Sequence, residues 1–126
     1  ILVFVRNVEK FPEIQKTNLK INCFDIKNIN NNSSNFDVVI NTASTSTLSE
    51  IKIKTKLLKK TAVVFDINYN PHLTELLKSA KLNNKKIIYG IHMLLYQAAP
   101  SFNNWFGFFP EVNNELIDIC INNIKK

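Results

Sequence analysis

"VVFDINYNPHLTELLKSAK", residues 63–81, contains the two patterns that define the fold, a short apolar strand followed by an amphipathic helix. The strand belongs to the run "AVVFDI" (62–67), which is nearly continuous in apolar residues, as expected for a strand covered on both faces. Asn70 can cap the helix that follows, and Pro71 suits its first turn. Apolar residues then recur at the spacing of one helix face: Leu73, Leu76, Leu77 and Ala80. The stretch therefore predicts a strand–helix unit.

The rest of the chain repeats this alternation. Four more apolar runs predict strands: "ILVFV" (1–5), "KINCF" (20–24), "DVVIN" (37–41) and "KIIY" (86–89). Further helices are predicted at 8–16, 53–60 and 90–107 and after Pro110, where Glu111 lies near the start and a stripe follows: Val112, Leu116, Ile119, Cys120 and Ile124. The polar stretch 26–35 is typical of a surface loop. The alternation predicts an α/β fold with a parallel sheet flanked by helices.

Composition limits the classes of protein to consider. A chain of 126 residues that is 45% apolar can form one domain with a real core. The net charge of +6 comes from dispersed lysines and a single arginine, Arg6, which gives little support to a nucleic-acid partner. Cys23 and Cys120 lie far apart without histidines spaced to complete a metal site, so we expect no metal. No segment reads as a membrane span or a signal peptide, so a reducing, cytoplasmic location is expected.

Ligands of open α/β sheets bind beyond the carboxyl ends of the strands. This rule selects the loops that start at Arg6, at Asn41, at Asp66 and at Gly90. A guanidinium beside the second strand of a dinucleotide fold suits the 2′-phosphate of NADP, although a solvated surface arginine is the alternative. The hydroxyl-rich loop "NTASTST" (41–47) could hold a ribose or a phosphate, or could be ordinary turn chemistry.

The run "GIHMLLYQAAPSFNNWFG" (90–107) is predicted to be a core helix with a polar minority. Gln97 lies one turn after Met93, so its amide is expected on a largely buried face, where an unpaired amide costs about 1–3 kcal/mol. It should therefore have a partner in the protein or a ligand. Pro100 lacks an amide hydrogen, which predicts a kink.

Taken in order, these segments resemble shikimate dehydrogenase, an NADP-dependent family. "VVFDINYNPHLTELLKSAK" is similar to its D-x-x-Y-N-P pattern, and "GIHMLLYQAAPSFNNWFG" to its G-x-G-M-L-x-x-Q-A run that ends in F-x-x-W-x-G. "NTASTST" looks like its N-A-T-x-x-G-M loop, and "FVRN" like its N-R-T segment. The resemblance implies a Rossmann-like sheet that lacks its first βα unit, with additional C-terminal helices.

The resemblance also implies an activity, the reversible reduction of 3-dehydroshikimate to shikimate by NADPH. Residues 1–126 would form one partial NADP-binding domain, a fragment without the N-terminal substrate domain that carries the catalytic Lys and Asp. Tyr69 and Gln97 would contact shikimate. The cofactor-binding residues that the resemblance implies lie at the strand ends: Arg6, Asn7, Lys10, Thr42, Ser44, Ile67, Gly90 and Met93.

Several positions depart from the family pattern. Val5, Ser46, Thr47 and His92 replace the family's asparagine, glycine, methionine and glycine, respectively. A side chain in place of glycine either excludes a positive φ or intrudes on the cofactor. The chain also lacks a GxGxxG, and its two glycines cannot form one. Two alternatives follow: a non-catalytic family descendant that acts as a binding or interaction module, and a basic α/β domain that binds a polyanion such as RNA.

Overall fold

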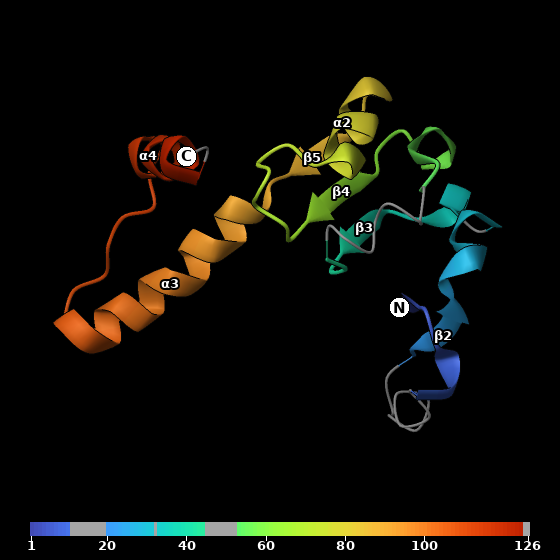
Figure 1. The fold of residues 1–126 in the computed structure, drawn as a ribbon, viewed down its shortest axis with the longest axis horizontal. Coiled ribbons are helices and arrows are strands. Elements are labelled where there is room, and N and C mark those ends of the chain that lie inside the picture. The colour runs from blue at the N-terminus through green and yellow to red at the C-terminus, as the bar shows by residue number, and fades with distance from the viewer. Residues whose placement is uncertain (11–19, 32, 45–52, 125–126) are drawn as a thin grey trace.

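The computed structural model describes residues 1–10, 20–31, 33–44 and 53–124. The strands precede the two longest helices, which form the C-terminal part of the chain (Figure 1). The strands are β1 (Leu2–Val5), β2 (Asn22–Asp25), β3 (Val38–Asn41), β4 (Val63–Asp66) and β5 (Lys86–Ile88). The α-helices are α2 (Glu75–Leu82), α3 (Gly90–Phe106) and α4 (Asn114–Ile124). All five predicted strands are therefore confirmed, within two residues at each end.

The described strands form two separate parallel sheets. β1 pairs with β2 in one sheet, and β3, β4 and β5 pair in that order in the other. The parallel arrangement and the flanking helices agree with the predicted fold class.

The core lies on one face of the three-stranded sheet, beneath α2. Alternate strand residues point to opposite faces, so Val39 and Val64 share the face that contacts the helix. They are buried with Leu77 and Ala80 of α2, and Leu58 and Ala62 close the same cluster. Burial of this face holds the carboxyl ends of the three strands in a fixed register.

The start of α2 differs from the prediction. The helix begins at Glu75 and its N-cap is Thr74, whose Oγ1 accepts a hydrogen bond from the Leu77 amide at 3.3 Å. Asn70 and Pro71 instead lie in the preceding turn, joined by a cis peptide bond. Asn70 is therefore not the cap, because the hydroxyl of Thr74 lies where it can reach both the Leu77 amide and a carboxylate at the end of β4.

Four other local predictions differ from the structure. The last helix begins at Asn114, with the Asn113 side chain accepting from the Leu116 amide at 3.0 Å, so Glu111 and Val112 precede it. The segment 53–60 contains only a short 3-10 helix, η5 (Thr55–Leu57). The segment 26–35 forms 3-10 helices η3 (Ile26–Asn31) and η4 (Ser33–Asn35), with Ile29 and Ser33 buried. Of the helix predicted at 8–16, the described part is the 3-10 helix η1 (Val8–Lys10), and 11–16 lie outside the described residues.

The long helix α3 is more exposed than a core helix. Figure 1 shows it leading away from the three-stranded sheet, and α4 contacts it. Only Gly90, Ile91 and Ala99 are buried within it, whereas the Trp105 side chain is 77% exposed. The helix continues through Pro100 and ends at Gly107, which has φ of 76°. No described helix has both the length and the apolar character needed to cross a membrane.

Candidate functional site

The candidate site lies at the carboxyl ends of β3 and β4, where Asp66 is the central residue. Its carboxylate is fully buried, and Asn41 faces it across the parallel register of the two strands. Oδ1 accepts hydrogen bonds from Asn41 Nδ2 at 2.9 Å, from the Asn68 amide at 3.0 Å and from Asn68 Nδ2 at 2.7 Å. Oδ2 accepts from Thr74 Oγ1 at 2.7 Å. Four donors therefore compensate the loss of water around this carboxylate.

Further hydrogen bonds in this network join the loop after β3 to the loop between β4 and α2. Asn41 Oδ1 accepts from the Ala43 amide at 3.1 Å, which turns the chain just after β3. Asn68 Nδ2 also donates to the Ala43 carbonyl at 2.8 Å, which ties the loop after β4 to the loop after β3. Thr74 connects this network to the start of α2. Two of the four loops predicted to contact ligand, those after β3 and β4, are therefore held together around one buried carboxylate.

The start of α3 lies directly against the loop after β4. Gly90 is buried, and a Cβ placed on it would be 2.3 Å from the Ile67 carbonyl oxygen and 2.7 Å from the Asn68 carbonyl oxygen. Both atoms belong to the backbone, so a side chain at this position would require the chain itself to move. Gly90 is required here by close approach, and the structure brings the predicted residues Ile67 and Gly90 into contact.

Aromatic rings extend this region on the side of α3. The rings of His72 and Tyr89 stack with centroids 4.1 Å apart, and Tyr89 and His92 stack at 6.3 Å. His92 lies inside α3, where its amide donates to the Tyr89 carbonyl at 3.2 Å. It therefore has helical backbone and requires no positive φ. Ser46 and Thr47 lie outside the described residues.

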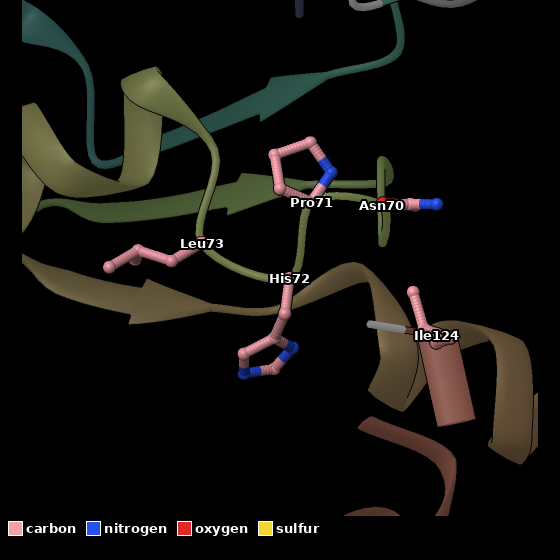
Figure 2. A pocket seen from close by; sticks show the side chains of 5 residues that line it. All are labelled: Asn70, Pro71, His72, Leu73 and Ile124. Carbon is pink, nitrogen blue, oxygen red and sulfur yellow. The ribbon is translucent and has the colours of Figure 1, made fainter. Parts of the chain in front are cut away.

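A pocket of about 420 Å³ opens beside the turn that precedes α2. Figure 2 shows its lining, which comes from the turn and from the end of α4: Asn70, Pro71, His72, Leu73 and Ile124. None of the residues predicted to bind cofactor or substrate lines it. Tyr69 precedes this turn and is 42% exposed.

The residues predicted to bind the 2′-phosphate lie on the other sheet. Arg6 and Asn7 follow β1 directly, and both are exposed, as is Lys10 at the end of η1. Asn7 Oδ1 accepts from the Glu9 amide at 3.0 Å, which starts that short helix. The carboxyl end of β1 thus presents a guanidinium and an ammonium group on one short segment. Thr42 and Ser44 are exposed after β3, where the sequence predicted them.

The prediction for Gln97 was wrong about its burial. Its side chain is exposed on α3, four residues after the half-buried Met93. It is one of the residues on one face of the helix that line a second pocket of about 430 Å³: Leu94, Gln97, Ala98, Ser101, Phe102 and Trp105. An exposed amide can bond to water, so burial gives no reason to expect a partner for Gln97. The side chain is exposed because the described residues leave this face of α3 uncovered.

Sequence reasoning missed the hydrogen-bond network around Asp66. Asn41, Asn68 and Thr74 were each visible as polar residues after a strand or before a helix, but nothing local connects them. The available signal was the pairing of Asn41 with Asp66 as the last residues of neighbouring parallel strands. Among the described residues, no group of three or more His, Cys, Asp or Glu side chains is arranged to hold a metal ion.

Comparisons with known proteins identify relatives of this chain. No family model matches it. It is 42% identical over 99 residues to shikimate dehydrogenase (NADP(+)) of Methanococcus aeolicus, across 73% of this chain and 36% of that protein. It is 36% identical over 115 residues to the enzyme of the same name from Methanococcus maripaludis, across 85% of this chain and 41% of that protein. The chain therefore spans well under half the length of these relatives.

The fold agrees with these relatives. The crystal structure of shikimate dehydrogenase from Aquifex aeolicus matches 87% of this chain and 40% of its own length, with a TM-score of 0.71 and 28% sequence identity. These relatives give no support to the alternative of a non-catalytic descendant. In both sequence and fold, the chain belongs to the shikimate dehydrogenase family and corresponds to part of the length of its members.

Proposed function

We propose that this chain is the C-terminal, cofactor-binding part of an NADP-dependent shikimate dehydrogenase. The complete protein would reversibly reduce 3-dehydroshikimate to shikimate, and its catalytic Lys and Asp would come from an N-terminal domain outside residues 1–126. Relatives that share 36–42% identity and carry this name support the proposal. The observation within the structure that carries it is the contact of Gly90 with the Ile67–Asn68 backbone at the ends of the strands.

The residues present fit NADP at two places. Arg6 and Lys10 are exposed cations near the end of β1, and a guanidinium matches the geometry and charge of a phosphate. Ile67 and Gly90 would approach the nicotinamide through their backbone, at the point where the missing Cβ of Gly90 lets the two chain segments pack together. Bound NADPH would supply the hydride. The chain has no glycine-rich loop for the pyrophosphate, so this part of the site would also come from outside residues 1–126.

The remaining predicted residues have positioning roles in this proposal. Thr42 and Ser44 would flank the cofactor from the loop after β3, which the hydrogen bond between Asn68 and Ala43 holds beside the loop after β4. Met93 would lie against the nicotinamide from the first turns of α3. Tyr69 would donate a hydrogen bond to the substrate through its phenol, and Gln97 would contact the same substrate through its amide.

The cofactor assignment is tested with the full-length polypeptide that carries this chain. Oxidation of shikimate and of quinate is followed by the absorbance of the reduced nicotinamide, with NADP and with NAD. Arg6→Ala should raise KM for NADP by about 10- to 100-fold and leave KM for NAD nearly unchanged, because only NADP carries the 2′-phosphate. The control is Lys20→Ala, an exposed cation beyond the opposite end of the same sheet. Equal effects of Arg6→Ala on both cofactors would contradict the assignment.

The substrate contact is tested by two matched tyrosine variants. Tyr69→Phe removes a phenol that is 42% exposed near the strand ends, and Tyr96→Phe removes one that is 61% exposed on α3. Loss of one hydrogen bond to the substrate should lower kcat/KM for shikimate by about 10-fold. Tyr96→Phe should have no effect. If no dehydrogenase activity is found with either acid or either cofactor, the proposed function is wrong.

A further inference from the structure

Asn68 lies between two residues that have roles in the proposed function. Ile67 precedes it and would approach the nicotinamide, and Tyr69 follows it and would donate to the substrate. The D-x-x-Y-N-P pattern leaves the position of Asn68 unspecified, so the resemblance assigns it no role. Its side chain is half-buried, whereas that of Tyr69 is exposed. Asn68 thus faces the protein at the point where its neighbour faces solvent.

The side-chain amide of Asn68 is held by two acceptors from different loops. Nδ2 donates to Asp66 Oδ1 at 2.7 Å and to the Ala43 carbonyl at 2.8 Å. A side-chain amide nitrogen carries two hydrogens, so these two bonds use its full donor capacity. Asp66 is fully buried and bonded on both carboxylate oxygens, which makes it a fixed anchor. Asn68 therefore ties the loop after β3 to a buried group at the end of β4.

Ala43 is the residue that receives this bond in the loop after β3. It lies between Thr42 and Ser44, the two residues proposed to flank the cofactor. Its amide donates to Asn41 Oδ1 at 3.1 Å. Its carbonyl also accepts from Asn41 Nδ2, but at 3.5 Å, so the bond from Asn68 is much the shorter of the two. Without the Asn68 amide, the Ala43 carbonyl would keep only the longer contact.

The backbone of the segment 67–69 is held by groups other than the Asn68 side chain. The Ile67 amide donates to the Asn41 carbonyl at 3.1 Å. The Ile67 and Asn68 carbonyls lie against Gly90, where no Cβ intervenes. Loss of the Asn68 side chain should therefore release the loop after β3 while the Ile67 backbone stays in place.

We propose that Asn68 is a positioning residue, which fixes the cofactor-flanking loop 42–44 relative to the segment 67–69. Its effect on turnover rests on the proposed function. Small displacements of the groups that orient reactants lower the rate of a reaction steeply, so a released loop should lower kcat. The 2′-phosphate would be held by Arg6 at the end of β1, on the other sheet. The affinity for NADP should therefore depend much less on Asn68 than turnover does.

Asn68→Ala in the full-length polypeptide tests this role. The substitution should lower kcat for shikimate oxidation by about tenfold or more and change KM for NADP by less than about threefold. Asn83→Ala is the matched control, because Asn83 Nδ2 also makes two bonds, to Thr55 Oγ1 at 3.0 Å and to the Ser79 carbonyl at 2.9 Å, but at the opposite end of α2 from the strand ends. The control should lower the urea midpoint by a similar amount and leave kcat unchanged.

The outcomes separate this role from a merely structural one. Equal kcat values for Asn68→Ala and Asn83→Ala would overturn the proposal. Asn68→Ser carries one hydroxyl hydrogen and cannot bridge both acceptors, so it should show the same loss of kcat, and it replaces Asn68→Ala if that variant does not fold. If the unsubstituted polypeptide has no dehydrogenase activity, the proposed function fails and this role fails with it. Activity in the unsubstituted polypeptide with unchanged kcat in the Asn68 variants overturns this role alone.

Hydrogen exchange at single amides, measured by NMR without cofactor, tests the position of the loop directly. The Ala43 amide is bonded to Asn41 Oδ1, so its exchange reports opening of the loop. In Asn68→Ala this amide should exchange about tenfold faster than in the unsubstituted polypeptide, whereas the Ile67 amide should keep its rate. Asn83→Ala should change neither rate. Unchanged exchange of the Ala43 amide in Asn68→Ala would overturn the proposal, whatever the activity.

Discussion

Replacement of Asp66 by alanine should destabilise the protein more than any exposed carboxylate substitution. The side chain is 0% exposed and accepts four hydrogen bonds. Without it, the Thr74 hydroxyl loses its acceptor and the Asn41 side-chain amide keeps only the Ala43 carbonyl at 3.5 Å, in residues that are 3 and 7% exposed. A buried polar group without a partner costs about 1–3 kcal/mol. Two such groups give an expected loss of about 4 kcal/mol in the free energy of unfolding.

Two variants establish whether this magnitude has the proposed cause. Asp66→Asn retains one acceptor oxygen for Asn41 and Asn68 but places an amide against the Thr74 hydroxyl, so its cost should be smaller, about 1–2 kcal/mol. Asp37→Ala removes a carboxylate that is 76% exposed and bonded to Lys59 at 2.6 Å, with an expected cost of about 0–1 kcal/mol. The expected order of stability loss is therefore Asp66→Ala, Asp66→Asn, Asp37→Ala.

Urea denaturation followed by far-UV circular dichroism measures these losses. Fluorescence is a poor probe because Trp105 is already 77% exposed in the folded chain. With a slope of about 2 kcal/mol per molar urea, Asp66→Ala should lower the midpoint by about 2 M. A midpoint for Asp66→Ala within about 0.5 M of that for Asp37→Ala would refute the reasoning. If Asp66→Ala does not fold, the comparison of Asp66→Asn with Asp37→Ala remains decisive.

Three further substitutions test separate features of the fold. Gly90→Ala should lower the urea midpoint more than Gly107→Ala. The new Cβ at position 90 would lie 2.3 Å from the Ile67 carbonyl oxygen, whereas at position 107 it would meet no atom within 4 Å and would only strain the positive φ. Thr55→Val should cost about 1–3 kcal/mol in the same assay, because Thr55 is 1% exposed and its hydroxyl bonds to two polar side chains near the end of α2. Pro100→Ala restores an amide inside α3, so the thermal midpoint and the helical circular dichroism signal should rise; a lower midpoint would contradict an uninterrupted helix at this position.

The predicted strands were accurate because each depends on a local property. Exposure of short runs of Val, Ile and Phe to water is unfavourable, so such runs are buried. A run without polar interruptions indicates a strand that is buried on both faces. Each of Arg6, Thr42, Ile67 and Gly90 directly follows, or ends, a predicted strand. Their position at the carboxyl ends of the strands can therefore be predicted without knowledge of any contact. The predicted helix starts were less accurate, as α2 shows. Thr74 caps this helix because its hydroxyl reaches the Leu77 amide and also bonds to Asp66, a residue eight positions earlier in the chain.

The sequence by itself determined an α/β chain with five parallel strands, its family, and the loops in which binding residues lie. Only the tertiary structure decided that Asp66 joins Asn41, Asn68 and Thr74, because these hydrogen bonds form between residues that are brought together by strand pairing. It also decided that Gln97 is exposed and that the sheet is divided, since burial depends on which surfaces meet. Periodicity shows which face of an element is apolar, but it does not show what covers that face.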